Sequence, residues 1–425
     1  MGLYYDGCVA MKRRKPKQEA LWIVAPQQSK LGAHPFYEAV NELLDAEGFD
    51  AWVERYCAKY YAPTMGRPSI EPGQYLRAML VGYFEGIDSE RGIAWRLADS
   101  LAVRSFLGLQ MGEGAPDHST LSRTRRLFGN ETHQAFFEWV LGLLFEAGKL
   151  NAKRLGIDAT TLEANAAMRS IVRRDTGETY DEFLKKLAVA EGAPHSTHEE
   201  LKRFDKNRKG KRMSNEEWVS ESDSEAMISR MKDGATHMAH KAEHAVDMES
   251  GAIVAVTVHG GAEGDTHTLP QTLDEAGETL KRIHDTPESP TTDVVADKGY
   301  HSNATLKDVQ ARGMRSYIAE PQQGKRNWAN DPDARRPFYA NRRRIKSKRG
   351  KAHMRKRGEI IERSFAHMYE TGGMRHIYLR GHKNIHKRIQ TQAAAFNISI
   401  LIRAKLGAGK PRALANLAAR AGTQG

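Results

Sequence analysis

The pattern of apolar residues changes character at Arg154. From Pro35 to about Lys149, apolar residues recur at the three-to-four spacing of amphipathic helices, and β-branched runs are few. Beyond Arg154 short apolar runs begin, and the first of them, Leu155 to Thr161, is typical of a buried strand. A chain of 425 residues is long enough for more than one domain. The sequence therefore predicts an all-α region that precedes an α/β region.

The second half alternates between predicted strands and helices. Two strands, Ala242 to Met248 and Ala252 to His259, flank Glu249-Ser-Gly, which is typical of a hairpin turn. Further elements then follow: a helix over 269–284, a strand over 293–297, a helix over 303–312, a strand over 314–319 and a last long helix over 384–405. A hairpin followed by such alternation predicts a mixed sheet flanked by helices.

Polar and irregular stretches mark further divisions of the chain. Residues 168–235 are charged and poorly periodic, and the basic cluster over 208–212 surrounds a glycine, so we interpret this stretch as an insertion. We therefore predict four parts: an irregular basic N-terminus over 1–34, a helical domain over 35–150, an α/β domain over 151–407 with the insertion at about 168–235, and a flexible tail over 408–425.

One segment of the helical half resembles the second half of a helix-turn-helix. Pro116 is followed by two candidate N-caps, Asp117 and Ser119, and then by a predicted helix. That helix carries three arginines: Arg123, Arg125 and Arg126. Two interpretations stay open, namely a helix that contacts DNA and an ordinary surface helix with a basic face.

Positive charge is concentrated in one stretch of the second half. The net charge is +12, and twelve of the 23 residues from Arg335 to Arg357 are Lys or Arg while none is acidic. A stretch of one sign favours contact with DNA or RNA over a solvated linker, with affinity that falls steeply as salt rises. The residues expected to contact nucleic acid here are Arg342, Arg343, Arg344, Lys346, Lys348, Arg349, Arg355, Arg357 and, just beyond, Arg363.

Cysteine usage and hydropathy limit the class of protein. The only cysteines are Cys8 and Cys57, which excludes a disulfide scaffold or a four-cysteine zinc site built from this chain. No run of eighteen apolar residues occurs, and the basic stretch from Lys12 to Lys17 is not followed by the apolar stretch of a signal peptide. We therefore expect a soluble protein of a reducing compartment, with no membrane partner.

Two other features have ordinary interpretations beside functional ones. His237, His240 and His244 could suggest zinc, but they lead into a predicted strand, where their spacing would not converge on one ion. Trp328 precedes the basic stretch and could stack on an unpaired base. We favour histidines without a metal, and a tryptophan of the core or the surface.

Three acidic residues stand in contexts that suggest chemistry. Asp158 and Asp297 each close a short apolar run that predicts a strand, and Glu362 lies in a predicted helix, near the edge of its buried face. Carboxylates from distant segments can hold divalent cations through oxygen. A pair of such ions activates the attacking oxygen and stabilises the leaving oxygen in phosphodiester chemistry. Together, these residues and the basic stretch indicate an enzyme that acts on DNA.

Each acidic residue also has a plain structural interpretation. Either aspartate could cap a turn after its strand, and Glu359 and Glu370 are rivals for Glu362. Two aspartates at the ends of two core strands would repel each other, and burial would raise the pKa of one, unless a cation lies between them.

Three blocks in these contexts carry a resemblance to a known family. Ile157-Asp-Ala-Thr, Val295-Ala-Asp-Lys-Gly-Tyr and Ile361-Glu-Arg-Ser-Phe resemble the acidic blocks of DDE transposases from bacterial insertion sequences, in the group related to IS-four and IS-five. The segments that begin at Tyr83 and Pro116 resemble the helical N-terminal region of that group. The resemblance covers about residues 35–405, with the blocks in the family's order.

The resemblance implies a ribonuclease-H-like catalytic domain after an all-α domain. It implies that Asp158, Asp297 and Glu362 are both catalytic and metal-binding, with two Mg²⁺ or Mn²⁺ ions. It also implies that a water cuts DNA at the element ends and that the freed 3′ hydroxyl attacks target DNA. The implied partners are double-stranded DNA, as terminal inverted repeats and as target, and a second copy of the chain; the implied location is the bacterial cytoplasm, at the nucleoid.

The third block departs from the family pattern. The family often has an arginine four residues before the glutamate and a lysine seven after it, where this chain has Gly358 and Tyr369. Arg355, Arg357 and Arg363 leave a basic group available nearby. Two other hypotheses remain: a catalytically inactive DNA-binding protein derived from a transposase, and a structure-selective nuclease of the same fold.

Overall fold

The structure is a computed structural model of the chain, and it describes residues 9–11, 34–62, 67–110, 112–192, 197–208, 213–231, 233–287, 289–322 and 327–422. The predicted irregular N-terminus lies almost wholly outside the described residues, and so does most of the basic cluster over 208–212. No helix among the described segments is both long enough and apolar enough to cross a membrane.

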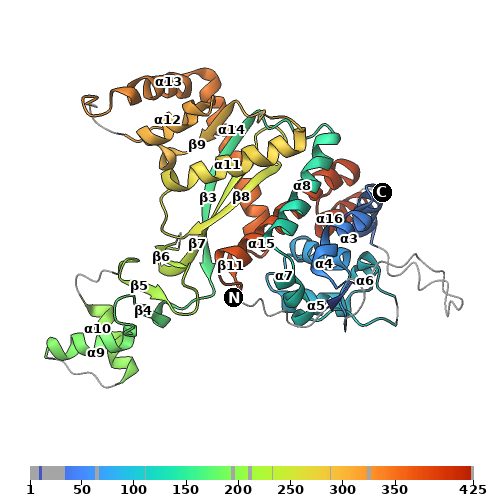
Figure 1. The fold of residues 1–425 in the computed structure, drawn as a ribbon, viewed down its shortest axis with the longest axis horizontal. Coiled ribbons are helices and arrows are strands. Elements are labelled where there is room, and N and C mark those ends of the chain that lie inside the picture. The colour runs from blue at the N-terminus through green and yellow to red at the C-terminus, as the bar shows by residue number, and fades with distance from the viewer. Residues whose placement is uncertain are drawn as a thin grey trace, which may run out of the picture.

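A seven-stranded mixed sheet forms the centre of the second half (Figure 1). β3 (Arg154–Ala164), β7 (Thr236–Asp247) and β8 (Ile253–Gly260) are antiparallel neighbours. β9 (Asp293–Ala296) pairs in parallel with β3, and β10 (Arg315–Ile318) pairs in parallel with β9. Two short strands complete the sheet, β6 (Met227–Arg230) on β7 and β11 (His376–Ile377) on β3. An antiparallel triplet followed by parallel crossovers is the ribonuclease-H-like arrangement, so the predicted fold class is confirmed.

Helices cover the two faces of this sheet. Side chains alternate between the faces of a strand, and Glu243 of β7, which Thr268 of α11 (Asp265–His284) contacts, therefore faces away from its neighbour His244. His244 packs instead against Phe365, the last residue of α14 (Lys348–Phe365). The remaining elements of this half are η3 (Lys298–Tyr300), α12 (Asn303–Ala311), η4 (Pro332–Ala334), α13 (Arg335–Lys346) and the π-helical turn η5 (Ala366–Glu370).

The first half is helical, as the patterning predicts. Its helices are α2 (Pro35–Ala46), α3 (Phe49–Cys57), η1 (Ala58–Tyr60), α4 (Pro72–Glu85), α5 (Glu90–Asp99), α6 (Leu101–Leu107), α7 (His118–Leu127) and α8 (Asn130–Glu146). The two-residue strands β1 (Val9–Ala10) and β2 (Arg67–Pro68) pair beside them. Pro72 begins α4 at the first helical position, where its missing N–H costs nothing.

The long helix α15 (His382–Leu406) joins the two halves. On one side, the side-chain amide of Asn397 bonds the backbone N–H and carbonyl of Ile253, at the edge of β8 that β7 leaves unpaired. On the other side, Lys387 donates to the carbonyls of Arg125 and Phe128, at the end of α7. α15 thus covers the open edge of the sheet and also supplies donors for carbonyls at the end of α7. Its buried apolar residues belong to one core that runs through both halves.

The segment predicted as a charged insertion folds into a small unit of its own. It contains η2 (Met168–Ser170), β4 (Ile171–Arg173), α9 (Tyr180–Ala190), α10 (His198–Asn207) and β5 (Trp218–Ser220), and it projects from one end of the sheet (Figure 1). Thr179 and Thr197 each begin a helix with a reciprocal capping box. Trp218 packs against Tyr180 and Phe183 in a separate apolar cluster.

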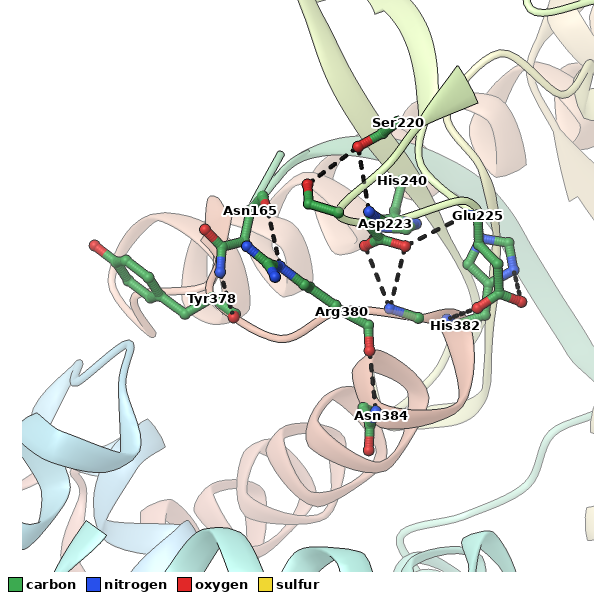
Figure 2. A network of polar contacts seen from close by, with 11 residues as sticks. Asn165, Ser220, Asp223, Glu225, His240, Tyr378, Arg380, His382 and Asn384 are labelled. Atoms are coloured by element: carbon green, nitrogen blue, oxygen red, sulfur yellow. Dashed lines mark hydrogen bonds and ion pairs between the residues drawn. The ribbon is translucent and has the colours of Figure 1, made fainter. Parts of the chain in front are cut away.

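A network of carboxylates ties this unit to the start of α15 (Figure 2). The buried carboxylate of Asp223 accepts hydrogen bonds from the backbone N–H of Gly381, 3.3 Å from either oxygen, and from Nε2 of His240, 3.0 Å away. Glu225 accepts one from the backbone N–H of His382 at 2.7 Å. Carboxylates at a helix N-terminus satisfy its free N–H groups and oppose its dipole, so the insertion caps α15 from outside.

A helix occupies most of the described part of the predicted C-terminal tail. Pro411–Gly422 form α16, which follows the buried residues Ala408 and Gly409. Proline at the first helical position favours this start, and Leu414 packs against the core that the helical half shares with α15. The tail therefore gains partners that its own composition did not predict.

Candidate active site

Asp158 and Asp297 lie beside each other on neighbouring strands. Gly156 of β3 pairs with Val295 of β9, and continuing this parallel register by two residues places Asp297 next to Asp158. β3 continues past its predicted end at Thr161 to Ala164, and Asp158 lies within the strand, whereas Asp297 directly follows β9. The longer strand arises because β7 pairs with β3 as far as Glu163, well beyond the apolar run.

The electrostatics of Asp158 match the repulsion expected from two such aspartates. Burial raises the pKa of the Asp158 carboxyl, and the negative charge of Asp297 raises it further. Arg357 of α14 opposes both effects, because its Nη1 lies 2.9 Å from Oδ2 of Asp158. The backbone N–H of Ala159 donates to the other oxygen at 2.9 Å. A cation bound between these two carboxylates would therefore relieve their repulsion.

A glycine lets α14 approach the sheet closely enough for that contact. A Cβ at Gly156 would lie 3.1 Å from Cδ1 of Ile361 and 3.4 Å from Cγ of Arg357. Both residues stand on the face of α14 that covers β3, and the face of β3 that carries Gly156 also carries Asp158. Larger side chains at residue 156 would lift α14 away from Asp158.

Glu362 is not part of this cluster. Ile360 and Ile361 are buried but Glu362 is exposed, because each step along a helix turns the side chain by about 100°. Across the described residues, no three acidic, histidine or cysteine side chains converge as metal ligands would. Its rivals are paired elsewhere, Glu359 with Arg363 and Glu370 with Arg375.

The fit to divalent cations is therefore partial. Asp158 and Asp297 present two adjacent carboxylates that repel each other, as oxygen ligands of a hard cation do. A third carboxylate from α14 does not join them in this arrangement. The guanidinium of Arg357 already neutralises part of the negative charge that a bound cation would neutralise.

Sequence reasoning missed two buried residues beneath the site. The hydroxyl of Tyr300 donates to Oε1 of Glu243 at 2.9 Å, and Thr268 donates to the same oxygen at 2.7 Å. Burial raises the pKa of Glu243, although these hydrogen bonds oppose the shift. Tyr300 was visible as the last residue of the Asp-Lys-Gly-Tyr block. Glu243 gave the weaker signal of a charged residue inside a predicted buried strand.

The predicted DNA-binding residues differ in their exposure and in the protein side chains that already engage them. Arg125 is buried, bonds Glu90 at 2.7 Å and reaches Asn384, so its prediction as a DNA contact is wrong: it fastens α7 to α5 and α15. Arg342 pairs with Glu320, Arg344 donates to the Ser316 carbonyl, and Arg357 pairs with Asp158. The exposed residues are Arg123, Arg126, Arg343, Lys346, Lys348, Arg349, Arg355 and Arg363.

The histidines and the tryptophan have ordinary surroundings. His240 bonds Asp223, His244 bonds the hydroxyl of Tyr369, and His237 bonds Asp233, so the three side chains have three separate partners. Trp328 is partly buried and packs against the ring of Phe338, with ring centroids 5.1 Å apart. Trp328 thus belongs to the edge of the core.

A ribonuclease-H-like sheet with two aspartates on adjoining central strands defines the class of protein, an enzyme of phosphodiester transfer. Residues 26–127 match the model of a transposase domain (DUF772), and residues 206–398 match the model of a transposase DDE domain. Both matches are to transposase domains, and they mark the chain as a DNA transposase with a DDE domain.

Other comparisons add less. The Mos1 transposase in a paired-end complex with the left transposon end matches at 11% identity and a TM-score of 0.20, over 81% of this chain and 95% of that chain. The comparison with curated proteins found no match.

Proposed function

We propose that this transposase cuts DNA at the ends of its insertion sequence and joins the freed ends to target DNA at a site that Asp158 and Asp297 form and that Glu362 completes once metal ions and DNA are bound. The observation that carries the proposal is the placement of Asp158 and Asp297 on adjoining strands, where burial and mutual repulsion raise the pKa of Asp158. Two carboxylates this close destabilise the fold, and groups with pKa values perturbed in this way cluster at functional sites. Its position on the central strands suits a reaction centre.

The proposed cofactor is a pair of Mg²⁺ or Mn²⁺ ions. When bound, such ions activate the attacking oxygen and stabilise the leaving oxygen. Asp158 and Asp297 would hold them through oxygen, and Glu362 would supply the third carboxylate. Arg357 keeps Asp158 neutralised in the free protein. Once a cation takes over that task, the Arg357 guanidinium is available for a DNA phosphate.

The proposed DNA surface consists of exposed basic side chains on α13 and α14. Arg343, Lys346, Lys348 and Arg355 are exposed there. Because such residues bind phosphates, they supply affinity and orientation with little sequence readout. Arg123 and Arg126 of α7 are exposed as well and form a second candidate surface. The proposed partners are the terminal inverted repeats, target DNA and a second copy of the chain, in the bacterial cytoplasm at the nucleoid.

The test is cleavage of DNA that carries the element's own flanking ends, with Mg²⁺ or Mn²⁺. Asp297→Ala and Glu362→Ala are expected to abolish cutting while binding persists. Glu359→Ala is the matched control, because Glu359 is an exposed glutamate on the same helix as Glu362. Glu359 pairs with Arg363 and is not assigned to the site. Cutting by Glu362→Ala at the wild-type rate would remove Glu362 from the site. Metal-dependent cutting by Asp297→Ala would overturn the proposal.

A further inference from the structure

The position of the Asp297 carboxylate depends on the turn that follows β9. Asp297 caps η3, and its Oδ1 accepts the backbone N–H of Gly299 at 2.8 Å. The same turn ends in Tyr300, whose side chain is fully buried. Asp297 itself is only partly buried, and Lys298 and Gly299 between them are exposed. The buried end of the turn therefore anchors the exposed end that carries Asp297.

Tyr300 ties this turn to the neighbouring strand pair. Its hydroxyl donates to Oε1 of Glu243, which is fully buried in β7. Glu243 lies opposite Ala159 in the β3–β7 register, and Ala159 directly follows Asp158. The hydrogen bond between Tyr300 and Glu243 thus links the turn of Asp297 to the strands that hold Asp158.

A second contact holds the same turn from the same face of β7. Lys241 lies two residues before Glu243, so their side chains share a face. Nζ of Lys241 lies 2.8 Å from Oδ1 of Asp265, the first residue of α11. The other carboxylate oxygen of Asp265 is so close to Gly299 that a Cβ there would lie 2.4 Å from it. The turn is therefore confined between Asp265 and the Tyr300 anchor.

We propose that Tyr300 and Glu243 are positioning residues of the transposase, which fix the Asp297 carboxylate beside Asp158 so that the two bind a divalent cation together. The proposal rests on the function proposed above for the two aspartates. Tyr300 and Glu243 act through the turn, and neither contacts the reacting phosphate. Residues that orient metal-binding side chains change metal affinity by about 10–100-fold when they are replaced.

The test compares two substitutions that remove one hydrogen bond each from the same oxygen. Tyr300→Phe deletes the hydroxyl that ties down the turn. Thr268→Val, its matched control, deletes the other donor to Oε1 of Glu243 but leaves the turn untouched. Binding of Mn²⁺ by the full chain is followed by electron paramagnetic resonance, with melting temperature and the Mn²⁺ dependence of DNA cleavage measured beside it.

Tyr300→Phe is expected to weaken Mn²⁺ binding about tenfold, with the cleavage rate largely recovered at saturating Mn²⁺. Thr268→Val is expected to keep the wild-type affinity even where its melting temperature falls as much. Equal weakening in both variants, or none in Tyr300→Phe, would overturn the positioning role, because the network would then support only the fold.

Two further variants keep the outcomes separate. If Tyr300→Phe does not fold, Glu243→Gln and Glu243→Leu replace it, since glutamine retains an acceptor for the Tyr300 hydroxyl and leucine does not. Equal Mn²⁺ affinity in these two would likewise overturn the proposal. Asp297→Asn tests the underlying function, because retained cleavage in that variant would overturn the proposed function itself. If Asp297→Asn loses cleavage while Tyr300→Phe keeps the wild-type Mn²⁺ affinity, only the positioning role of Tyr300 and Glu243 is overturned.

Discussion

Nη1 of Arg357 lies 2.9 Å from Oδ2 of Asp158 and 3.3 Å from the carbonyl oxygen of Ile157. The two side chains are 13% and 30% exposed, so the pair is sheltered but not sealed. Nε of Arg357 is buried and has no hydrogen-bond partner among the described residues. The guanidinium is therefore only partly satisfied in this position, and a competing cation can replace it at Asp158 without breaking a complete set of bonds.

Replacing Arg357 should therefore destabilise the protein in a way that depends on pH. We expect Arg357→Gln to lower the free energy of unfolding by about 2 kcal/mol at pH 7, because the buried charge of Asp158 loses its compensation. The pKa of Asp158 is already raised and would rise further, so Asp158 takes up a proton as the pH falls and the loss should shrink toward pH 4.

Urea denaturation at pH 7 and pH 4.5 measures this difference. Arg363→Gln is the matched control, since Arg363 stands on the same helix in an exposed pair with Glu359, where a loss below about 1 kcal/mol is expected. A loss at Arg357 that is the same at both pH values would show that Asp158 is not the source.

The cap on α15 should give the protein a sensitivity to acid. Burial alone would raise the pKa of Asp223, but hydrogen bonds from His240 and from the backbone of Gly381 and Glu225 hold this pKa below its ordinary value. A carboxyl with a lowered folded pKa contributes stability above its unfolded pKa of about 4, and loses it as the pH falls through the folded pKa. We expect Asp223→Asn to cost about 1–3 kcal/mol at pH 7 and progressively less as the pH falls through the folded pKa of Asp223.

Unfolding of wild type and Asp223→Asn across pH 2–7 checks this expectation. Glu221→Gln provides the comparison, because Glu221 is an exposed carboxylate two residues away in the same loop. If Asp223→Asn lowers the free energy of unfolding by the same amount in strong acid, the charge of Asp223 does not contribute to stability.

Binding of DNA should identify which arginines and lysines face the phosphates. Removing one phosphate contact lowers the salt slope of affinity by about 1. Arg343→Ala and Lys346→Ala, both exposed at the end of α13, are expected to show this reduction on any DNA sequence.

The control for this experiment is Lys405→Ala. Lys405 is also exposed, but it lies at the end of α15 and pairs with Glu42 of α2. Fluorescence anisotropy from 50 to 300 mM salt gives the slopes. An unchanged slope in the α13 variants, or a reduced one in Lys405→Ala, would move the DNA surface elsewhere on the molecule.

Local patterns predicted the elements well because neighbours in sequence decide them. The apolar run before Asp297 and the Glu249-Ser-Gly turn led to β9 and to the β7–β8 hairpin, although β7 begins at Thr236, six residues before its predicted start. Predictions failed where a distant partner decides the outcome. β3 extends past its predicted end at Thr161 because β7 pairs with it, and Arg125 is buried because Glu90 and Asn384 receive its hydrogen bonds.

The sequence by itself determined the order of strands and helices, the family and the two aspartates, because periodicity and short motifs act through residues close together in the chain. Only the tertiary structure decided that Arg357 reaches Asp158, that Glu362 is exposed, and that Tyr300 meets Glu243. Such pairs depend on the register between strands and on the rotation of a helix about its axis. Both are set by the packing of segments more than fifty residues apart, which no local pattern contains.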